Sequence, residues 1–301
     1  MAFEVRIERD SIWNDRRITT FVCTYPRIIH AEIMTHRMFC RNAASSRAIP
    51  VKKMLKQITD DPFIPIRWGK NQKGMQQGAE LTDGESVDAQ QIWLHARDHA
   101  ILHVERLIEL GLHKSLPNRI LEPWSWITTV ITATEWANFF RQRMHPDAEV
   151  HFQKLAKMMF DAMEESTPAA CRVHMPFLDE EEHLLADVCF YSEQVESWKD
   201  VTQWARIAAA RCARVSYLTQ DGVKDVEKDK ELADRLTQGS GFGHWSPFEH
   251  VAFGQAESAK DLFKGPFRGW YSYRSCVPQE NLGGQIPEYK ESVKEFPELL
   301  V

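Results

Sequence analysis

The stretch Thr35–Arg47, which reads THRMFCRNAASSR, is the most informative part of this 301-residue sequence. Arg37 and the run Ser45–Arg47 stand towards its two ends, and the small residues Ala43 and Ala44 lie between them. Arginine donates paired hydrogen bonds to phosphate, and small side chains let backbone N–H groups approach an anion. The pattern therefore predicts a phosphate-binding loop, although a basic surface loop would show the same charge spacing.

The residues around this stretch predict a strand, a helix and a loop. Ile18–Tyr25 is rich in β-branched and aromatic residues, which favours a strand. Pro26 stands where a helix can begin, so we expect a helix over Ile28–Arg37. Met38–Pro50 has no periodicity and several Asn, Ser and small residues, which indicates an ordered loop.

The rest of the chain predicts a helix-rich α/β protein with a small central sheet, in one domain over residues 1–301. Apolar residues from Val87 to Ile108 recur at helical spacing until Gly111 ends the pattern. Trp124–Met144 reads as buried and helical towards its end, and Asp179–Glu182 as a solvated acidic face. The further elements that we expect are a helix opened by Pro146 and ended before Pro168, helices over Trp198–Cys212 and Asp225–Leu236, and a strand over His250–Gln255.

Composition limits the classes of partner. The formal net charge is -6, so polymeric nucleic acid is a poor partner for the protein as a whole. Residues 36–56 nevertheless contain no Asp or Glu among several basic residues, which suits a small anionic ligand. The charged N-terminus, the lack of a long apolar stretch and six scattered cysteines predict a soluble, cytoplasmic protein with reduced thiols.

Two further groups of residues have a less specific pattern. His95, His99 and His103 are spaced four apart and would share one helix face, but no fourth ligand is evident, so we assign no metal site. Cys40 lies inside the signature stretch and is a candidate nucleophile. A free cysteine is more often a small buried hydrophobe, so we expect Cys40→Ser to keep most of its turnover.

The signature stretch resembles that of the flavin-dependent thymidylate synthases, which runs Arg-His-Arg, seven residues, Ser. His36, Arg37 and Ser45 match it, and Asn42 and Arg47 match two further positions. Four other segments are similar to segments of the same family, and they are Asn118–Pro123, Asn138–Arg143, Ala213–Tyr217 and His244–His250.

Two features depart from the family pattern. The last two of these segments precede the signature in the family but follow it here, which suggests a circularly permuted order. Thr35 and Ala43 replace an arginine and an acidic residue that the family uses on the flavin and nucleotide. These changes bear on the binding mode and on the substrate.

The resemblance implies a reaction and a set of site residues. The family transfers a one-carbon unit from methylenetetrahydrofolate to C5 of dUMP, and FAD reduced by NADPH supplies the hydride. By matched position, Arg143 would be the catalytic residue and hold the pyrimidine, with His244 and Glu249 as supporting residues. The nucleotide would be bound by Ser45, Ser46, Arg47, Arg119 and Arg143, and the flavin by Thr35, His36, Arg37, Asn138 and Ser246.

Other outcomes stay open at this point. A relative could methylate or hydroxymethylate dUMP or dCMP for modified nucleotides, which the changed Thr35 and Ala43 motivate. A non-catalytic nucleotide-binding protein is the alternative from another class. The family resemblance also implies a homotetramer whose active sites are shared between chains.

Overall fold

The computed structural model describes residues 3–191, 195–217, 225–238 and 244–277. Its first sheet has five strands in the order β3-β4-β2-β1-β5. Pairing is antiparallel within β3-β4-β2-β1, and β5 runs parallel to β1. The bounds of these strands are Glu4–Trp13 (β1), Arg16–Pro26 (β2), Cys40–Ala43 (β3), Trp126–Ala133 (β4) and Ala169–Ala170 (β5).

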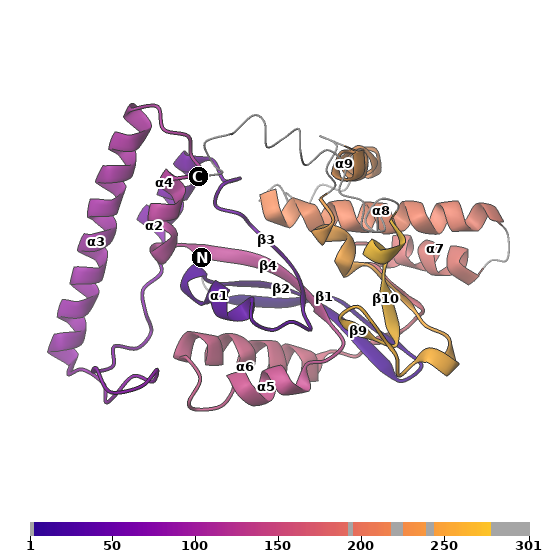
Figure 1. Ribbon diagram of the computed structural model, residues 1–301, viewed down its shortest axis with the longest axis horizontal. Coiled ribbons are helices and arrows are strands. Elements are labelled where there is room, and N and C mark those ends of the chain that lie inside the picture. The colour runs from indigo at the N-terminus through magenta and orange to yellow at the C-terminus, as the bar shows by residue number, and fades with distance from the viewer. Residues whose placement is uncertain (1–2, 192–194, 218–224, 239–243, 278–301) are drawn as a thin grey trace, which may run out of the picture.

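Helices cover both faces of this sheet (Figure 1). Phe21 and Tyr25 of β2 pack with Phe152 and Met159 of one helix on one face, while Val22 on the other face packs with residues of a second helix. The helices on the first face are α5 (Ala137–Arg143) and α6 (Val150–Glu165), and the helix on the opposite face is α8 (Val195–Tyr217).

A second small sheet adjoins the turn that joins β1 to β2. Its strand order is β6-β7-β10-β8-β9. Trp13 Nε1 donates to the carbonyl of Gln255 at 2.9 Å, and Trp270 Nε1 donates to the carbonyl of Arg16 at 2.9 Å, so the β1–β2 hairpin is tied to this sheet. Its elements are Val173–His174 (β6), Ala252–Gly254 (β7), Phe263–Lys264 (β8), Phe267–Arg268 (β9), Trp270–Ser272 (β10), with α7 (Glu180–Tyr191) and α9 (Val226–Gln238) nearby.

The long helix is α3, Asp83–Glu109, and it stands apart from the main body on the left of Figure 1. Thr82 and Glu85 form a capping box at its start, and Gly111 follows its end with a φ of 79°, a conformation that suits glycine. The prediction of this helix is confirmed. Its apolar face is covered unevenly: Ala100 and Val104 are buried, whereas Val87 is 54% exposed. The short helices beside it are α2 (Val51–Asp60) and α4 (Pro117–Ile120).

Two predictions around the signature stretch are wrong. The helix expected over Ile28–Arg37 is a 3₁₀ turn, Arg27–Ile29, followed by α1, His30–Ile33. Arg41 Nη1 donates to the carbonyls of Ile33 and His36, both at 3.0 Å, which satisfies the backbone where the helix stops. The expected loop contains strand β3, which exists because it pairs with β4.

Further along the chain, the predicted elements are present, but some of their limits differ from the prediction. Trp124–Met144 is helical towards its end, as predicted, where it forms α5, and its first half forms strand β4. The helix expected from Pro146 begins at Val150, where the Glu149 side chain accepts from Phe152 N at 2.9 Å. The two later helices and the strand near Gln255 are confirmed as α8, α9 and β7.

The acidic run Asp179–Glu182 is more than a solvated face. It begins α7, and the Glu182 carboxylate receives two hydrogen bonds from Arg211, at 2.5 and 2.7 Å. Arg211 is buried and also donates to Asp229 Oδ2 at 2.8 Å, so an ion network joins α7, α8 and α9. No helix in the described part of the chain is both long and apolar enough to cross a membrane.

Candidate functional site

The signature strand β3 is held against the late segments of the chain. Asn42 is buried, and its Nδ2 donates to the carbonyl of Cys212 in α8 at 2.9 Å. Ser246 Oγ lies 3.3 Å from Asn42 Oδ1 and begins the 3₁₀ helix Ser246–His250 (η4). Segments about 170 and 200 residues apart along the chain thus meet at one side chain.

A cavity of about 640 Å³ opens beside this contact. It lies between the end of β3, the loop after α3, α8, α9 and η4. No acidic residue lines it among those that the structure describes, and its polar groups are hydroxyls, imidazoles, an amide and a guanidinium, so its chemistry suits an anion. Its lining residues are Asn42, Ser45, Arg47, Ala48, His113, Ser115, Ala213, Leu236, His244, Ser246 and Pro247.

The cavity brings together part of the expected site. Ser45 and Arg47, expected on the nucleotide, and Ser246, expected on the flavin, all line it, and His244 joins them. Ser46 does not, because it is only 4% exposed.

Arg119, like Ser46, was expected to bind the nucleotide but does not line the cavity. It is exposed on α4, next to Asn118. Asn118 Nδ2 donates to the carbonyls of Ser46 and Ile49, at 2.8 and 2.9 Å. Asn118 therefore fixes the backbone of the loop that carries Ser45 and Arg47.

Arg143 lies in a different group of residues. Its Nε donates to His36 Nε2 at 2.9 Å, and its Nη1 is 3.5 Å from Glu32 Oε2. The guanidinium also lies 4.5 Å from the centre of the Phe152 ring. Burial, and then the charges of Arg143 and Arg41, lower the pKa of His36 to about 4. His36 is therefore neutral at pH 7, and its Nε2 lone pair accepts from Arg143.

The remaining expected flavin residues are exposed. Thr35 and Arg37 flank His36 on the surface, and Thr35 Oγ1 donates to the carbonyl of Glu32 at 2.6 Å. Asn138 lies on α5 and accepts from Arg141 Nη2 at 3.1 Å.

The residues around Arg143 and the Ser45 cavity lie at opposite ends of β3. Cys40, which follows the His36 turn, pairs with Thr132, whereas Ala44, next to Ser45, bonds to Thr128. Arg143 is therefore not among the residues that line the Ser45 cavity.

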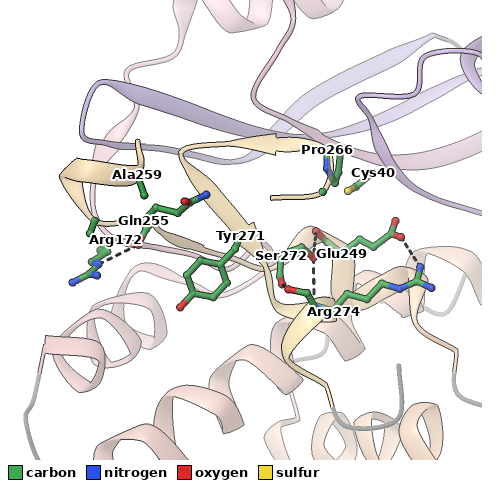
Figure 2. Close-up of a pocket in the computed structure, with 13 residues that line it drawn as sticks. Cys40, Arg172, Glu249, Gln255, Ala259, Pro266, Tyr271, Ser272 and Arg274 are labelled. Carbon is green, nitrogen blue, oxygen red and sulfur yellow. Dashed lines mark hydrogen bonds and ion pairs between the residues drawn. The ribbon is translucent and has the colours of Figure 1, made fainter. Parts of the chain in front are cut away.

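The surroundings of Cys40 do not support a nucleophile. The side chain is 3% exposed, and burial, with the charge of Glu249 beside it, raises the pKa of the thiol well above its usual value. The thiol is protonated at neutral pH, and thiolate is the attacking form. Glu249 accepts from Arg274 Nη1 at 2.5 Å (Figure 2).

Sequence reasoning missed two residues of the cavity, His113 and Ser115. They lie in the loop after α3, and His113 Nδ1 is 3.0 Å from Ser115 Oγ. Neither belongs to a recognisable segment, so spacing alone gave no signal. The three histidines of α3 are exposed and line a separate shallow groove, and no metal-binding group of three ligands occurs among the described residues.

Comparison with known proteins gives a family. The family model described as thymidylate synthase complementing protein matches residues 8–169. The chain belongs to this family. The match contains the signature stretch, Arg119 and Arg143, and it ends before Ser246. As a member of the family, the protein is a pyrimidine-nucleotide methyltransferase.

Solved structures with some likeness to the chain include a UMP/dUMP methylase and a thymidylate synthase. The Streptomyces cacaoi methylase PolB bound with 5-Br UMP is 14% identical, with a TM-score of 0.46, over 54% of this chain and 89% of that chain. The flavin-dependent thymidylate synthase ThyX from Helicobacter pylori, complexed with FAD and dUMP, is 17% identical, with a TM-score of 0.35, over 48% and 67%. A search of curated proteins finds no significant match.

Proposed function

We propose that the protein is a flavin-dependent thymidylate synthase that converts dUMP to dTMP, with methylenetetrahydrofolate as carbon donor and NADPH as reductant of FAD. The observation that carries this proposal is the cavity where Ser45, Arg47 and Ser246 meet, with no acid among its described lining residues, in a chain of the matching family. The family resemblance implies that these same side chains bind the nucleotide and the flavin.

The residues present fit a phosphorylated cofactor and a nucleotide. Arg47 can form a paired hydrogen bond to phosphate, and Ser45 and Ser246 offer hydroxyl donors. Bound FAD would supply the hydride, which no side chain can supply. The chain itself binds and orients the reactants and excludes water from them.

Arg143 is the residue that we assign to the pyrimidine. It carries a positive charge at any working pH and can stabilise negative charge on the N3/O4 side of the ring. Neutral His36 accepts from its Nε, and this bond leaves the Nη groups to face a ligand or Glu32. With the Cys40 thiol protonated, activation through ring charge is the route that these side chains favour over attack at C6.

The replaced acid at Ala43 motivates the second candidate, a methylase or hydroxymethylase of dUMP or dCMP. Ala43 is half-buried in β3, opposite Thr129, so neither side chain brings a charge to this position. Cytosine carries an amine where uracil has an acceptor. The loss of the family's carboxylate at position 43 therefore changes which of the two bases is favoured. A non-catalytic nucleotide-binding protein is the third candidate.

A product assay separates the three candidates. Purified protein is incubated with FAD, NADPH, methylenetetrahydrofolate and either dUMP or dCMP, and the nucleotide mass is measured. We expect dTMP from dUMP. A hydroxymethyl product, or activity on dCMP alone, would establish the second candidate. A protein that takes up no FAD and forms no product would establish the third.

A further inference from the structure

The loop 44–49 joins β3 to α2 and forms part of the wall of the Ser45 cavity. Side chains from other parts of the chain hold its carbonyl groups. Arg27, which follows β2, donates through Nη2 to the carbonyl of Ala44 at 3.0 Å. Asn118 of α4 donates through Nδ2 to the carbonyl of Ser46 at 2.8 Å. Neither donor lines the cavity, so both carbonyls are turned towards the protein and away from the cavity.

These two carbonyls determine the direction of two N–H groups. In a trans peptide unit, the C=O and the N–H of the next residue point in opposite directions. By this rule Arg27 directs the N–H of Ser45, and Asn118 directs the N–H of Arg47. Ser45 and Arg47 both line the cavity, and neither of their N–H groups has a hydrogen-bond partner among the described residues. Both backbone donors are therefore available to a ligand in the cavity.

Asn118 is the more constrained of the two side chains. It is fully buried, and its Nδ2 also donates to the carbonyl of Ile49 at 2.9 Å, so it holds the loop on both sides of Arg47. Its Oδ1 is buried without a hydrogen-bond partner in the part of the chain that the structure describes. Such an oxygen lowers stability, and an apolar side chain would avoid that cost. What the amide provides here is the pair of hydrogen bonds that its nitrogen donates.

Lys114 connects the same loop to the opposite wall of the cavity. Its Nζ donates to the carbonyl of Ala48 at 2.9 Å. Its neighbours in the sequence, His113 and Ser115, line the cavity from the loop after α3. The spacing between the two walls therefore depends on a hydrogen bond to the backbone of loop 44–49 as well as on packing.

We propose that Arg27 and Asn118 are positioning residues for substrate binding, which direct the backbone N–H groups of Ser45 and Arg47 at the phosphate of the nucleotide. The two N–H groups and the Arg47 guanidinium then form an anion site whose backbone donors are already oriented before the ligand arrives. Neither positioning residue contacts the ligand itself. The inference rests on the proposed function, because that function supplies the nucleotide.

The test is Asn118→Leu, which keeps a similar shape, adds no charge and removes both hydrogen-bond donors. Calorimetric titration of the full chain with FAD bound measures the affinity for dUMP, and inorganic phosphate is the second probe. We expect dUMP to bind at least tenfold more weakly, because a misdirected donor loses its hydrogen bond to a charged group. Arg27→Met, which keeps the aliphatic stem, should weaken binding in the same way and serves if Asn118→Leu does not fold.

Gln153→Met is the matched control, since Gln153 Nε2 likewise donates to two carbonyls, those of Pro146 and Ala148. It should leave the affinity for dUMP within about twofold, because it holds a different loop. Steady-state turnover separates positioning from a general loss of structure. In Asn118→Leu the KM for dUMP should rise at least tenfold while kcat, FAD uptake and the KM for NADPH change little, because contacts to the phosphate are the same before and during reaction.

Three results would overturn the inference. They are an affinity for dUMP in Asn118→Leu and Arg27→Met equal to that of Gln153→Met, loss of FAD uptake together with dUMP binding in both variants, and an unchanged protein that binds neither dUMP nor inorganic phosphate. Failure of the proposed function would give a different result. Binding that depends on Asn118, with no methylated product, would refute the methylation and leave the positioning role in place.

Discussion

At the scale of single residues, Arg143 and Arg141 offer a direct comparison on one short helix. Arg143 is half-buried against His36, Glu32 and Phe152, whereas Arg141 is exposed and donates to Asn138. Lysine keeps the charge of arginine but loses its planar set of donors, so the exchange tests geometry and not charge alone.

We expect Arg143→Lys to lower kcat about 100-fold, because losing one oriented donor to developing charge costs about that much. Arg141→Lys should stay within about twofold of the unchanged protein, as substitutions at exposed positions have small effects. Steady-state turnover of dUMP with saturating FAD, NADPH and methylenetetrahydrofolate is the measurement. Equal turnover of the two variants would remove Arg143 from the catalytic role.

The sequence predicts which residues belong to the candidate site more readily than where each of them lies in the fold. The expected Ser45, Arg47 and Ser246 do share a cavity, because they lie in segments with a recognisable pattern. Ser46 has the same chemistry as Ser45 but points into the core, and no local pattern at that position distinguishes the two.

At the scale of elements, tertiary pairing decided what local pattern could not. Four residues of β3 form a strand because β4 offers hydrogen-bonding partners, although their own sequence has no alternation. The helix before it stops at Ile33 because a side chain eight residues later binds its last carbonyls. In contrast, α3 has its capping box and its terminal glycine within its own sequence, so its limits could be predicted.

Asn42 connects β3, α8 and η4, and its loss should weaken their packing. We expect Asn42→Ala to lower the free energy of unfolding by about 1–3 kcal/mol, because the buried Cys212 carbonyl loses a donor. Urea unfolding followed by circular dichroism measures this. Asn138→Ala, at an exposed position, is the control for stability and should change it by less than about 0.5 kcal/mol. A loss no larger than that of the control would show that Asn42 does not join these elements.

A buried polar chain connects the two sheets. His174 Nε2 is 2.7 Å from Thr20 Oγ1, which is 2.6 Å from Thr132 Oγ1, and this hydroxyl is 2.8 Å from His250 Nδ1. Burial lowers the pKa of His250 to about 3 and that of His174 well below its usual value. Both imidazoles are therefore neutral in the folded protein, while they titrate near 6.5 in the unfolded chain.

This difference predicts loss of stability in acid. The contribution of the neutral histidines is fully present above pH 6.5 and decreases as pH falls towards 3, because the unfolded chain binds the additional protons. From 6.5 and about 3, His250 alone should cost about 2 kcal/mol at pH 5. Urea unfolding at pH 7.5 and pH 5 measures the difference.

The histidine responsible can be identified by substitution. His250→Gln should reduce the pH dependence by about one proton, whereas His145→Gln, at an exposed position, should leave it unchanged. Equal slopes for the two variants would show that the buried imidazole is not the source.

At the scale of the whole molecule, the order of the segments along the chain is related to where the expected site residues lie. The late segments return to the signature strand through α8 and η4, so they line the cavity although they follow the signature along the chain. Arg143 lies at the other end of β3, where its own chain provides His36 and Glu32 but none of the cavity residues. We therefore propose that a complete site that uses both groups takes them from two chains, as the family resemblance implies.

Mixing two inactive variants tests this division. Arg47→Met disables the cavity and Arg143→Lys disables the other group, so each protein alone should be nearly inactive. When the two are co-expressed and purified together, random assembly should restore about one quarter of the activity, because each site draws its two groups from different chains. A mixture of Arg143→Lys with the double variant is the control and should stay inactive, since no assembly then contains an intact Arg143. Failure of the first mixture to recover activity would place both groups in a site formed by one chain.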